Sequence, residues 1–531
     1  MNFLDWLVVI VYITSLILLS NYLGKHQAST EDYYLAGRKL SWWTIGLSTM
    51  ATQLGAISFI SAPAFVALKP NGGLIWLGYE FAVPAAMVFI MIFIIPVVHR
   101  AKVVSIYEYL GRRFDQNTRS LISFIFQVSR ALATGVSIYA VGIVLSLVVN
   151  LSLTTTIILI GLVTIIYDTL GGIKAVIYSD VIQMIILTLG IAICGWTAYL
   201  LVGGWESVVA NISPERLKIV NIKSHGFGDG NDFSFWALVI GGFFLYASYY
   251  GCDQSQIQRE LSARSVDDTK KSLMFNGLVR FPLVVAYCAM GLFIGAFAHQ
   301  NAEFMDLIPM DKVDYMVPVF ILNYLPHGLI GLVVVAILAA FMSSLDSAIN
   351  SLSAATMRDI YQQYIKPGAD DKHYLLWSKV FTVFWGVVCT LFAFIVGAIS
   401  ETVIESINKV GSVFYGPVLA AFILAIMVKR ATSTGVKVGV VSGVLINLVL
   451  WVGFPKVSWL WWNATGCITA LAVAYLWSLL APQPEPTDLI VKESISVKES
   501  SGINWKPRYA FLALYFFAII LLSYIVGLIW V

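Results

Sequence analysis

Charged residues are scarce in this sequence, and their scarcity excludes a water-soluble protein. Asp, Glu, Lys and Arg make up only 12% of the 531 residues, whereas hydrophobic residues make up 59%. Soluble domains carry about 25% charged residues, so lipid must cover much of this surface. The net charge is only +3. Because no stripe of basic and aromatic residues is present, we do not expect binding to nucleic acid.

Cysteine and histidine are also few, and neither is arranged for chemistry. The five cysteines lie in apolar stretches without CxxC spacing, which argues against structural disulfides and zinc sites. The six histidines lie in predicted loops or at span ends, so no catalytic constellation is visible and we expect no enzyme. The apolar run from Phe3 to Leu23 lacks a basic leader and a cleavage site. It predicts a retained helix rather than a signal peptide.

Apolar runs of span length fill the chain instead. They predict an all-α, polytopic membrane protein with one transmembrane domain over 1–531 and about 14 spanning helices. Lys and Arg collect in alternate loops, so both termini should face outside. The polar stretches 203–232 and 482–507 are expected to be surface loops. The predicted spans are 3–23, 41–67, 74–98, 117–149, 152–169, 174–202, 233–258, 272–298, 327–362, 373–398, 401–428, 433–454, 457–481 and 508–530.

Two spans are interrupted by polar and small residues near their centres. The second contains Ala51-Thr52-Gln53-Leu54-Gly55-Ala56-Ile57-Ser58, which is either a helix-packing face or an unwound binding segment. The seventh contains Tyr246-Ala247-Ser248-Tyr249-Tyr250-Gly251-Cys252-Asp253-Gln254. Two broken spans five helices apart indicate an inverted-repeat transporter with a midplane binding site.

Two further spans carry hydroxyls and carboxylates. Ser343 and Ser347 share one face of the ninth span, where they would suit a hard cation or bond back to the preceding turn. Asp346 lies between them, and a carboxylate in the membrane needs a cation, a proton or a basic partner. Asp180 follows the turn at Gly171-Gly172. It is either a carboxylate favoured by a helix N-terminus or a second cation ligand.

These motifs resemble the sodium/solute symporter family, which includes sodium/glucose and sodium/sialic acid cotransporters. The likeness covers nearly the whole chain and includes Ser29 to Arg38, the turn from Gly171 to Gln183, and Ser255 to Arg259. It implies a LeuT-like core of five plus five helices over 41–428. The helix at 3–23 would precede that core, and those in 433–530 would follow it.

The resemblance also implies sodium ligands. The family builds its main sodium site from carbonyls and hydroxyls whose counterparts are Ala51, Leu54, Ala340, Ser343 and Ser344. Some sialic acid transporters hold a further sodium, and the counterparts are Asp180, Ser343, Asp346 and Ser347. Asp346 replaces a serine of those transporters, which either strengthens that site or substitutes a proton. One sodium ion, or two, is therefore expected.

The same resemblance places a substrate pocket at Gln53, Gly55, Ser58, Tyr79, Glu80, Arg130, Tyr246, Tyr249 and Arg280. Arg130 lies where sialic acid transporters hold a carboxylate, although an internal salt bridge to Glu80 or another acid is the alternative. Glu80 and Arg280 match positions that sodium/sugar transporters use on sugar hydroxyls. Tyr249 is either an inner gate or a packing residue.

The sequence thus predicts a sodium-coupled symporter that imports a small polar solute by alternating access. The solute is a sugar, a sialic acid or another carboxylate, or a neutral sugar or polyol if Arg130 is structural. An ion channel would need a repeated filter loop, and a sensor would need an added signalling domain. Neither feature is visible in the sequence. We expect a lipid-embedded monomer in a cell membrane, with a bacterial inner membrane as the default.

Overall fold

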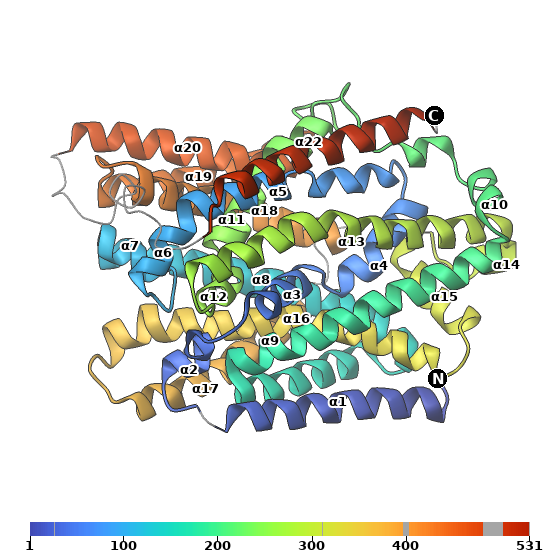
Figure 1. Cartoon of the computed structure of the whole chain (residues 1–531), viewed down its shortest axis with the longest axis horizontal. Coiled ribbons are helices and arrows are strands. Elements are labelled where there is room, and N and C mark those ends of the chain that lie inside the picture. Colours follow the sequence, from blue (N-terminus) through green and yellow to red (C-terminus); the bar gives the residue numbers. More distant parts are fainter. Residues whose placement is uncertain (26, 311, 397–402, 482–502, 530–531) are drawn as a thin grey trace.

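The computed structural model describes residues 1–25, 27–310, 312–396, 403–481 and 503–529, and these residues form long helices lying roughly side by side (Figure 1). Within this part of the chain there are no strands, only two isolated β-bridges. Polar residues cap many helix N-termini: Asn2 with Asp5 begins α1 (Phe3–Gly24), and Ser29 begins α2 (Thr30–Leu35). These caps satisfy amide groups that the helix itself leaves unpaired.

The first repeat of the core begins with a broken span. α3 (Trp42–Gln53) and α4 (Ala56–Ala67) meet at an angle of 55°. The next span is continuous through η2 (Leu74–Glu80), α5 (Val83–Phe89), η3 (Ile90–Ile94) and α6 (Ile95–Ala101). A short helix, α7 (Tyr107–Arg113), leads to α8 (Gln116–Val149). The interruption predicted at Leu54 and Gly55 is therefore present.

The segment α9 (Leu153–Val202) contains two of the predicted spans, which meet at a kink. Its 50 residues would measure about 75 Å as a straight helix, more than twice the roughly 30 Å of a bilayer core. Gly172 interrupts it at φ 57° and ψ −165°, a conformation open essentially to glycine alone. A Cβ at this position would lie 2.7 Å from the Tyr33 carbonyl oxygen. The glycine turn thus separates the two spans as the sequence predicted.

The second repeat also begins with a broken span, at Asp253. Its members are η5 (Ala237–Gly241), α11 (Gly242–Cys252), α12 (Gln254–Leu261), α13 (Val266–Gln300), α16 (Leu329–Ala355) with η7 (Thr356–Ile365), α17 (Asp371–Val396) and α18 (Val403–Met427). α16 packs against α1, α3, α4, α8 and α9, which makes it the centre of the bundle. The remaining long helices are α19 (Ser433–Gly453), α20 (Trp459–Leu480) and α22 (Lys506–Ile529).

The expected number of spans is only partly tested. By length and composition, the described residues hold 11 spanning helices, or 12 with the bent pair as one span. That count treats α9 as one helix and leaves out the 16-residue apolar segment Ala237–Cys252. The all-helical architecture agrees with the prediction, whereas the number of 14 spans stays a prediction.

The connecting segments contain short helices that the sequence reading did not predict. The stretch 203–232 holds α10 (Trp205–Ala210) and η4 (Pro214–Leu217), and α14 (Ala302–Asp306), η6 (Val313–Tyr315) and α15 (Met316–Tyr324) lie before α16. Short polar segments lack the long periodic pattern on which helix prediction depends. Most of the predicted loop 482–507 lies outside the described residues.

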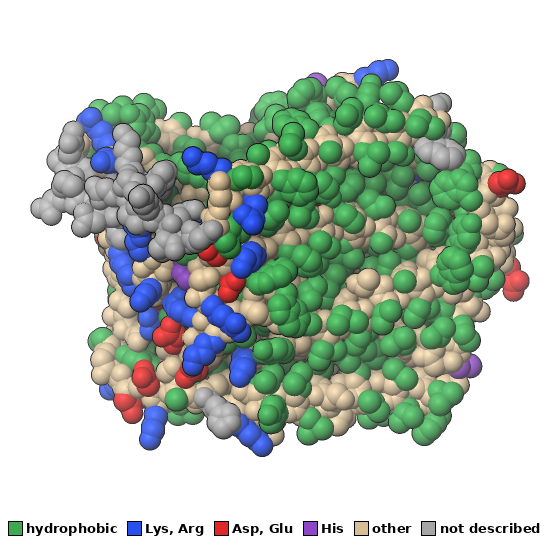
Figure 2. Space-filling view, in the orientation of Figure 1, with side chains coloured by type: hydrophobic (Ala, Val, Ile, Leu, Met, Phe, Trp, Pro, Cys, Tyr) green, Lys and Arg blue, Asp and Glu red, His purple; other side chains and the backbone are tan. Residues whose placement is uncertain are grey.

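The face of the protein drawn in Figure 2 has a broad apolar area and a basic end. Figure 2 shows hydrophobic side chains over the broad face and Lys and Arg gathered at one end. In Figure 1 both chain ends lie at the opposite end of the bundle. At the basic end, Asp115 caps α8 and binds Lys437, at 3.1 Å, and Ser433 of α19. Burial raises the pKa of the Asp115 carboxyl, but hydrogen bonds from Ser433, Thr118 and Lys437 outweigh it and lower the pKa to about 2.

Candidate functional site

The break between α3 and α4 leaves helical groups unpaired at the centre of the protein. Leu54 departs from helical geometry at φ −84° and ψ 65° while its amide still donates to Met50 O at 2.9 Å. Gly55 then begins α4, with a backbone of extended conformation. The carbonyl end of α3 and the amide end of α4 therefore meet at one point, where they favour a cation and an acceptor respectively.

The hydroxyls of α16 lie directly against this break. Ser343 Oγ donates to Ala51 O and to Ala340 O, each at 3.0 Å, and Ser344 Oγ donates to Thr52 O at 2.9 Å. A Cβ added to Gly55 would lie 2.9 Å from Ser344 Oγ, so only glycine lets the two helices approach this closely. Four of the predicted main sodium ligands are thereby gathered, with Leu54 buried at the break itself. Their role as ligands stays a prediction.

The four residues predicted for a second sodium also lie close together, and two of them bind an arginine. The Arg259 guanidinium donates from Nη2 to Asp180 Oδ2 at 3.1 Å and to Ser347 Oγ. Asp346 Oδ2 accepts from the Tyr167 hydroxyl at 2.5 Å, and Asp346 Oδ1 accepts from Ser347 Oγ at 3.1 Å. All of these side chains are buried. The carboxylates therefore have partners of their own within the protein.

Sequence reasoning missed several members of this cluster, including the Tyr167 hydroxyl that binds Asp346. Ser48 on α3 donates to Asp180 Oδ2 at 2.5 Å and accepts from Arg259 Nε at 2.8 Å. Asp168 on α9 is fully buried and accepts from Asn350 Nδ2 at 3.3 Å. Arg259 was noted only as the end of a motif. The available signal was charge, since a buried carboxylate needs a cationic partner and Arg259 is an arginine on a core helix.

Arg130 is paired within the protein. Its Nη2 donates to Asp253 Oδ2, and its guanidinium carbon lies 5.4 Å from the centre of the Tyr249 ring. Asp253, at the break between α11 and α12, also accepts from the Ser255 amide at 2.9 Å. The internal salt bridge that the sequence offered as an alternative is therefore present, with Asp253 rather than Glu80 as the acid.

Glu80 and Arg280 form a second buried pair. Arg280 Nε donates to Glu80 Oε2 at 3.2 Å and its Nη2 donates to Oε1 at 3.0 Å, while the two side chains are 3% and 1% exposed. This fork geometry is the strong form of an arginine–carboxylate contact. Among the residues that the structure describes, Arg280 Nη1 has no partner, and neither do the buried hydroxyls of Tyr246 and Tyr250. Polar atoms without partners thus remain in this part of the core.

The other predicted pocket residues lie around the broken helices. Gln53, Gly55 and Ser58 are half-buried at the α3–α4 break, and Gln53 Oε1 has no partner. The Tyr79 ring centre lies 5.5 Å from that of Tyr246, and the Tyr79 hydroxyl donates to Asn408 Oδ1 at 3.0 Å. Tyr249 is contacted by Gln256 Nε2 at 2.8 Å. Whether these residues bind substrate stays a prediction.

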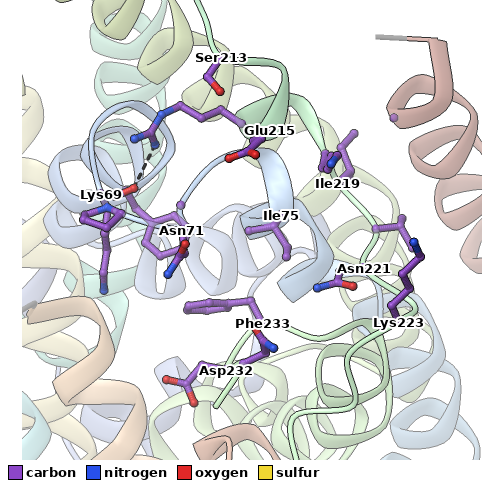
Figure 3. Close-up of a pocket in the computed structure, with 18 of the residues that line it drawn as sticks. Lys69, Asn71, Ile75, Ser213, Glu215, Ile219, Asn221, Lys223, Asp232 and Phe233 are labelled. Atoms are coloured by element: carbon purple, nitrogen blue, oxygen red, sulfur yellow. Dashed lines mark hydrogen bonds between the residues drawn. The ribbon is translucent and has the colours of Figure 1, made fainter. Parts of the chain in front are cut away.

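A cavity of about 1070 Å³ opens beside the end of α4 (Figure 3). Phe65 and Phe233 line it, and their rings pack on Trp76. Trp76 in turn stacks on Tyr79 at 5.2 Å, so an aromatic cluster separates the cavity from Tyr246. Arg216 reaches from η4 to the end of α4, where its Nη1 donates to Val66 O at 3.2 Å and Lys69 O at 3.1 Å.

Comparisons with known proteins agree with this arrangement. The sequence model of the sodium:solute symporter family matches residues 33–443. The chain is 28% identical over 477 residues to the sodium/sialic acid symporter NanT of Aliivibrio fischeri, covering 89% of this chain and 92% of that protein. It is 27% identical over 476 residues to the sodium/glucose cotransporter of Vibrio parahaemolyticus, covering 85% of each.

A solved structure extends the likeness to the fold. A substrate-bound, outward-open Na+-coupled sialic acid symporter superimposes with a TM-score of 0.82 at 25% identity, covering 92% of this chain and all of that one. These relatives are transporters rather than enzymes. The chain is accordingly a multi-pass membrane protein and a sodium-coupled symporter of small organic solutes, with a LeuT-like fold. By its sequence and its fold, the chain belongs to the sodium:solute symporter family.

Proposed function

We propose that the chain couples sodium bound at the α3–α16 site to the import of a neutral, hydroxyl-rich solute such as a sugar or a polyol. One observation carries the choice of solute: both arginines predicted to meet the substrate are already bound to carboxylates, Arg130 to Asp253 and Arg280 to Glu80. A site whose charges are internally neutralised offers a carboxylate substrate no net attraction.

The ion pair between Arg130 and Asp253 disfavours binding of a carboxylate substrate for a second reason. A carboxylate substrate would have to displace Asp253, which also holds the amide and hydroxyl of Ser255 at the start of α12. A displaced Asp253 would be a charge left 6% exposed without its cation. Leaving one partner of a buried pair unpaired costs about 3–5 kcal/mol. We therefore assign Arg130 a structural role at the second helix break.

The Glu80–Arg280 region suits hydroxyl groups instead. The Glu80 carboxylate can accept hydrogen bonds, and Arg280 Nη1, which has no partner among the described residues, can donate one. The hydroxyls of Tyr246 and Tyr250 can donate or accept. A site built from such groups rejects analogues that lack the matching hydroxyl, because its own polar groups are then left unpaired. The Tyr79 and Tyr246 rings add apolar faces of the kind that pack against a sugar ring.

Coupling follows from the shared break. The carbonyl oxygens of α3 that face Ser343 and Ser344 and the solute positions Gln53, Gly55 and Ser58 lie on one interrupted segment. If sodium orders this segment, solute and sodium must raise each other's affinity by the same factor. Each net positive charge moved inward adds about 2.3 kcal/mol per 100 mV of membrane potential.

The membrane placement is part of the proposal. We assign the basic end of Figure 2 to the cytoplasm, so that both termini and the cavity of Figure 3 face outside. Solute would then approach through that cavity and meet the aromatic cluster at Trp76 and Tyr79. We further propose that the protein lies in a bacterial inner membrane and works as a monomer.

The test is the thermal stability of the purified protein in sodium or choline, with hexoses, polyols, sialic acid and small monocarboxylates added singly. Ligands that bind only the folded state raise the melting temperature. We expect a neutral solute to stabilise only in sodium, and Glu80→Gln to lose that response. The Arg130→Gln/Asp253→Asn double variant removes the pair together and should keep it. A response confined to carboxylates and lost in the double variant would instead establish Arg130 as a substrate ligand.

A further inference from the structure

The cluster between α9, α12 and α16 contains a cation that belongs to the protein. Arg259 is 1% exposed, and each of its guanidinium nitrogens donates a hydrogen bond: Nε to Ser48, Nη1 to the Ser255 carbonyl, and Nη2 to Asp180 and Ser347. Its position is therefore fixed on every side. Asp180 and Ser347 are two of the four residues that would hold a second sodium.

The remaining two residues of that set are also engaged elsewhere. The Ser343 hydroxyl is directed to the carbonyls of Ala51 and Ala340, which belong to the main sodium site. Asp346 accepts from Tyr167 and from Ser347. Two of the four residues, Asp180 and Ser347, thus bind the guanidinium, while Ser343 and Asp346 are hydrogen-bonded to other groups. Among the described residues, Asp180 Oδ1 is the one carboxylate oxygen of the set without a partner, so the set does not offer the several free oxygen ligands that a further metal ion needs.

We propose that Arg259 takes the place of a second transported cation, so that the chain binds and carries one sodium ion per cycle. Two unit charges about 4 Å apart in a protein interior repel strongly enough to weaken sodium binding by about a thousandfold. A tethered guanidinium beside Asp180 therefore excludes sodium from that position. It also stays behind when the main-site sodium leaves, so the Asp180 carboxylate keeps a cationic partner throughout the cycle.

This inference rests on the main sodium site proposed above, but its test needs no solute. We would measure equilibrium binding of 22Na+ to the purified protein, counting ions per protein. We expect one ion in the wild type and one in Arg259→Lys, which keeps the charge. Arg259→Gln removes the charge but keeps hydrogen-bonding groups, and we expect it to bind two.

A second variant keeps the test decisive if Arg259→Gln does not fold. Asp180→Asn should still bind one sodium with an affinity within about twofold of the wild type, because Asp180 binds Arg259 and Ser48 rather than a sodium ion. Ser343→Ala is the comparison, since it should lose affinity. Two ions in the wild type, one ion in a folded Arg259→Gln, or loss of sodium binding in Asp180→Asn would each overturn the inference. No sodium binding in the wild type would refute the main site itself and not merely the exclusion by Arg259.

Discussion

Replacing Ser343 by alanine is the most direct test of the coupling site. Its hydroxyl lies 3.0 Å from Ala51 O on the broken span and 3.0 Å from Ala340 O on its own helix. The substitution removes one of five expected oxygen ligands and leaves the backbone carbonyls in place. Hydrogen bonds to charged groups are worth about 1.5–3 kcal/mol, and we take the same range for one hydroxyl on sodium. Sodium binding should weaken about 10- to 150-fold.

The assay is the sodium dependence of unfolding. Sodium at 100 times the wild-type Kd stabilises the folded protein by about 2.7 kcal/mol. If the substitution raises Kd a hundredfold, the same concentration contributes only about 0.4 kcal/mol. The sodium-induced rise in melting temperature should therefore nearly disappear. In choline, the melting temperature of the variant should fall only by the small amount expected from the loss of one hydrogen bond.

Ser351→Ala is the matched control. Ser351 is buried on the same helix two turns away and donates to the Ala348 carbonyl at 2.9 Å. It should lose a similar amount of stability in choline yet keep the full sodium response. Equal sodium responses in the wild type and Ser343→Ala would refute the assignment of Ser343 as a ligand.

Three further changes test the fold around the site. Glu80→Gln leaves the Arg280 guanidinium without its carboxylate partner and should lower the free energy of unfolding in urea by about 3–5 kcal/mol. The Glu80→Gln/Arg280→Met double variant should be less destabilised. Equal losses in the two variants would contradict the ion-pair argument. Because the pKa of Asp115 is lowered from 3.8 to about 2, its stabilisation is complete above pH 4 and lost as the pH falls towards 2, so the melting-temperature gap between wild type and Asp115→Asn should shrink over that window. A constant gap would exclude linkage to this carboxyl. Gly172→Ala should destabilise the protein by about 1–3 kcal/mol in the same unfolding assay, because the backbone conformation of Gly172 is strained for other residues. Gly195→Ala in α9 is the control, because its added Cβ would meet Met290 at an ordinary 3.6 Å. Similar effects of both substitutions would show that backbone conformation is not the cause.

The all-helical membrane fold could be predicted from sequence because a lipid bilayer requires long apolar helices. A span needs about 20 apolar residues, and departures from that pattern are costly enough to mark function. The break at Leu54 and Gly55 and the turn at Gly172 were both visible as small or polar residues within apolar runs. The short helices α10 and α15 were not visible, because their placement depends on neighbouring loops and helices rather than on their own pattern.

The site was harder to predict because the partner of a buried charged side chain depends on which helices pack together, and the sequence alone does not give that packing. The sequence identified Arg130 and Glu80 as buried charges but offered no means to tell that their partners are Asp253 and Arg280. The four-residue spacing of Ser343 and Ser347 was sufficient to predict that their hydroxyls share one helix face, since that geometry is local. Ser344 was predicted to lie at the site only through the family resemblance. The contact of Arg259 with Asp180 joins residues 79 positions apart, and no local pattern records it.

The contact between Arg216 and the end of α4 has a consequence for the rate of transport. Two hydrogen bonds, to the carbonyls of Val66 and Lys69, tie the end of α4 to a segment that lines the cavity. Opening of the aromatic cluster by movement of α4 would require these bonds to break, and such lid movements limit turnover in many enzymes and carriers. Because both acceptors are neutral carbonyls, this tether should hold almost equally well across physiological pH. The segment around Arg216 would then affect the rate at which solute enters, without changing the affinity with which the site binds it.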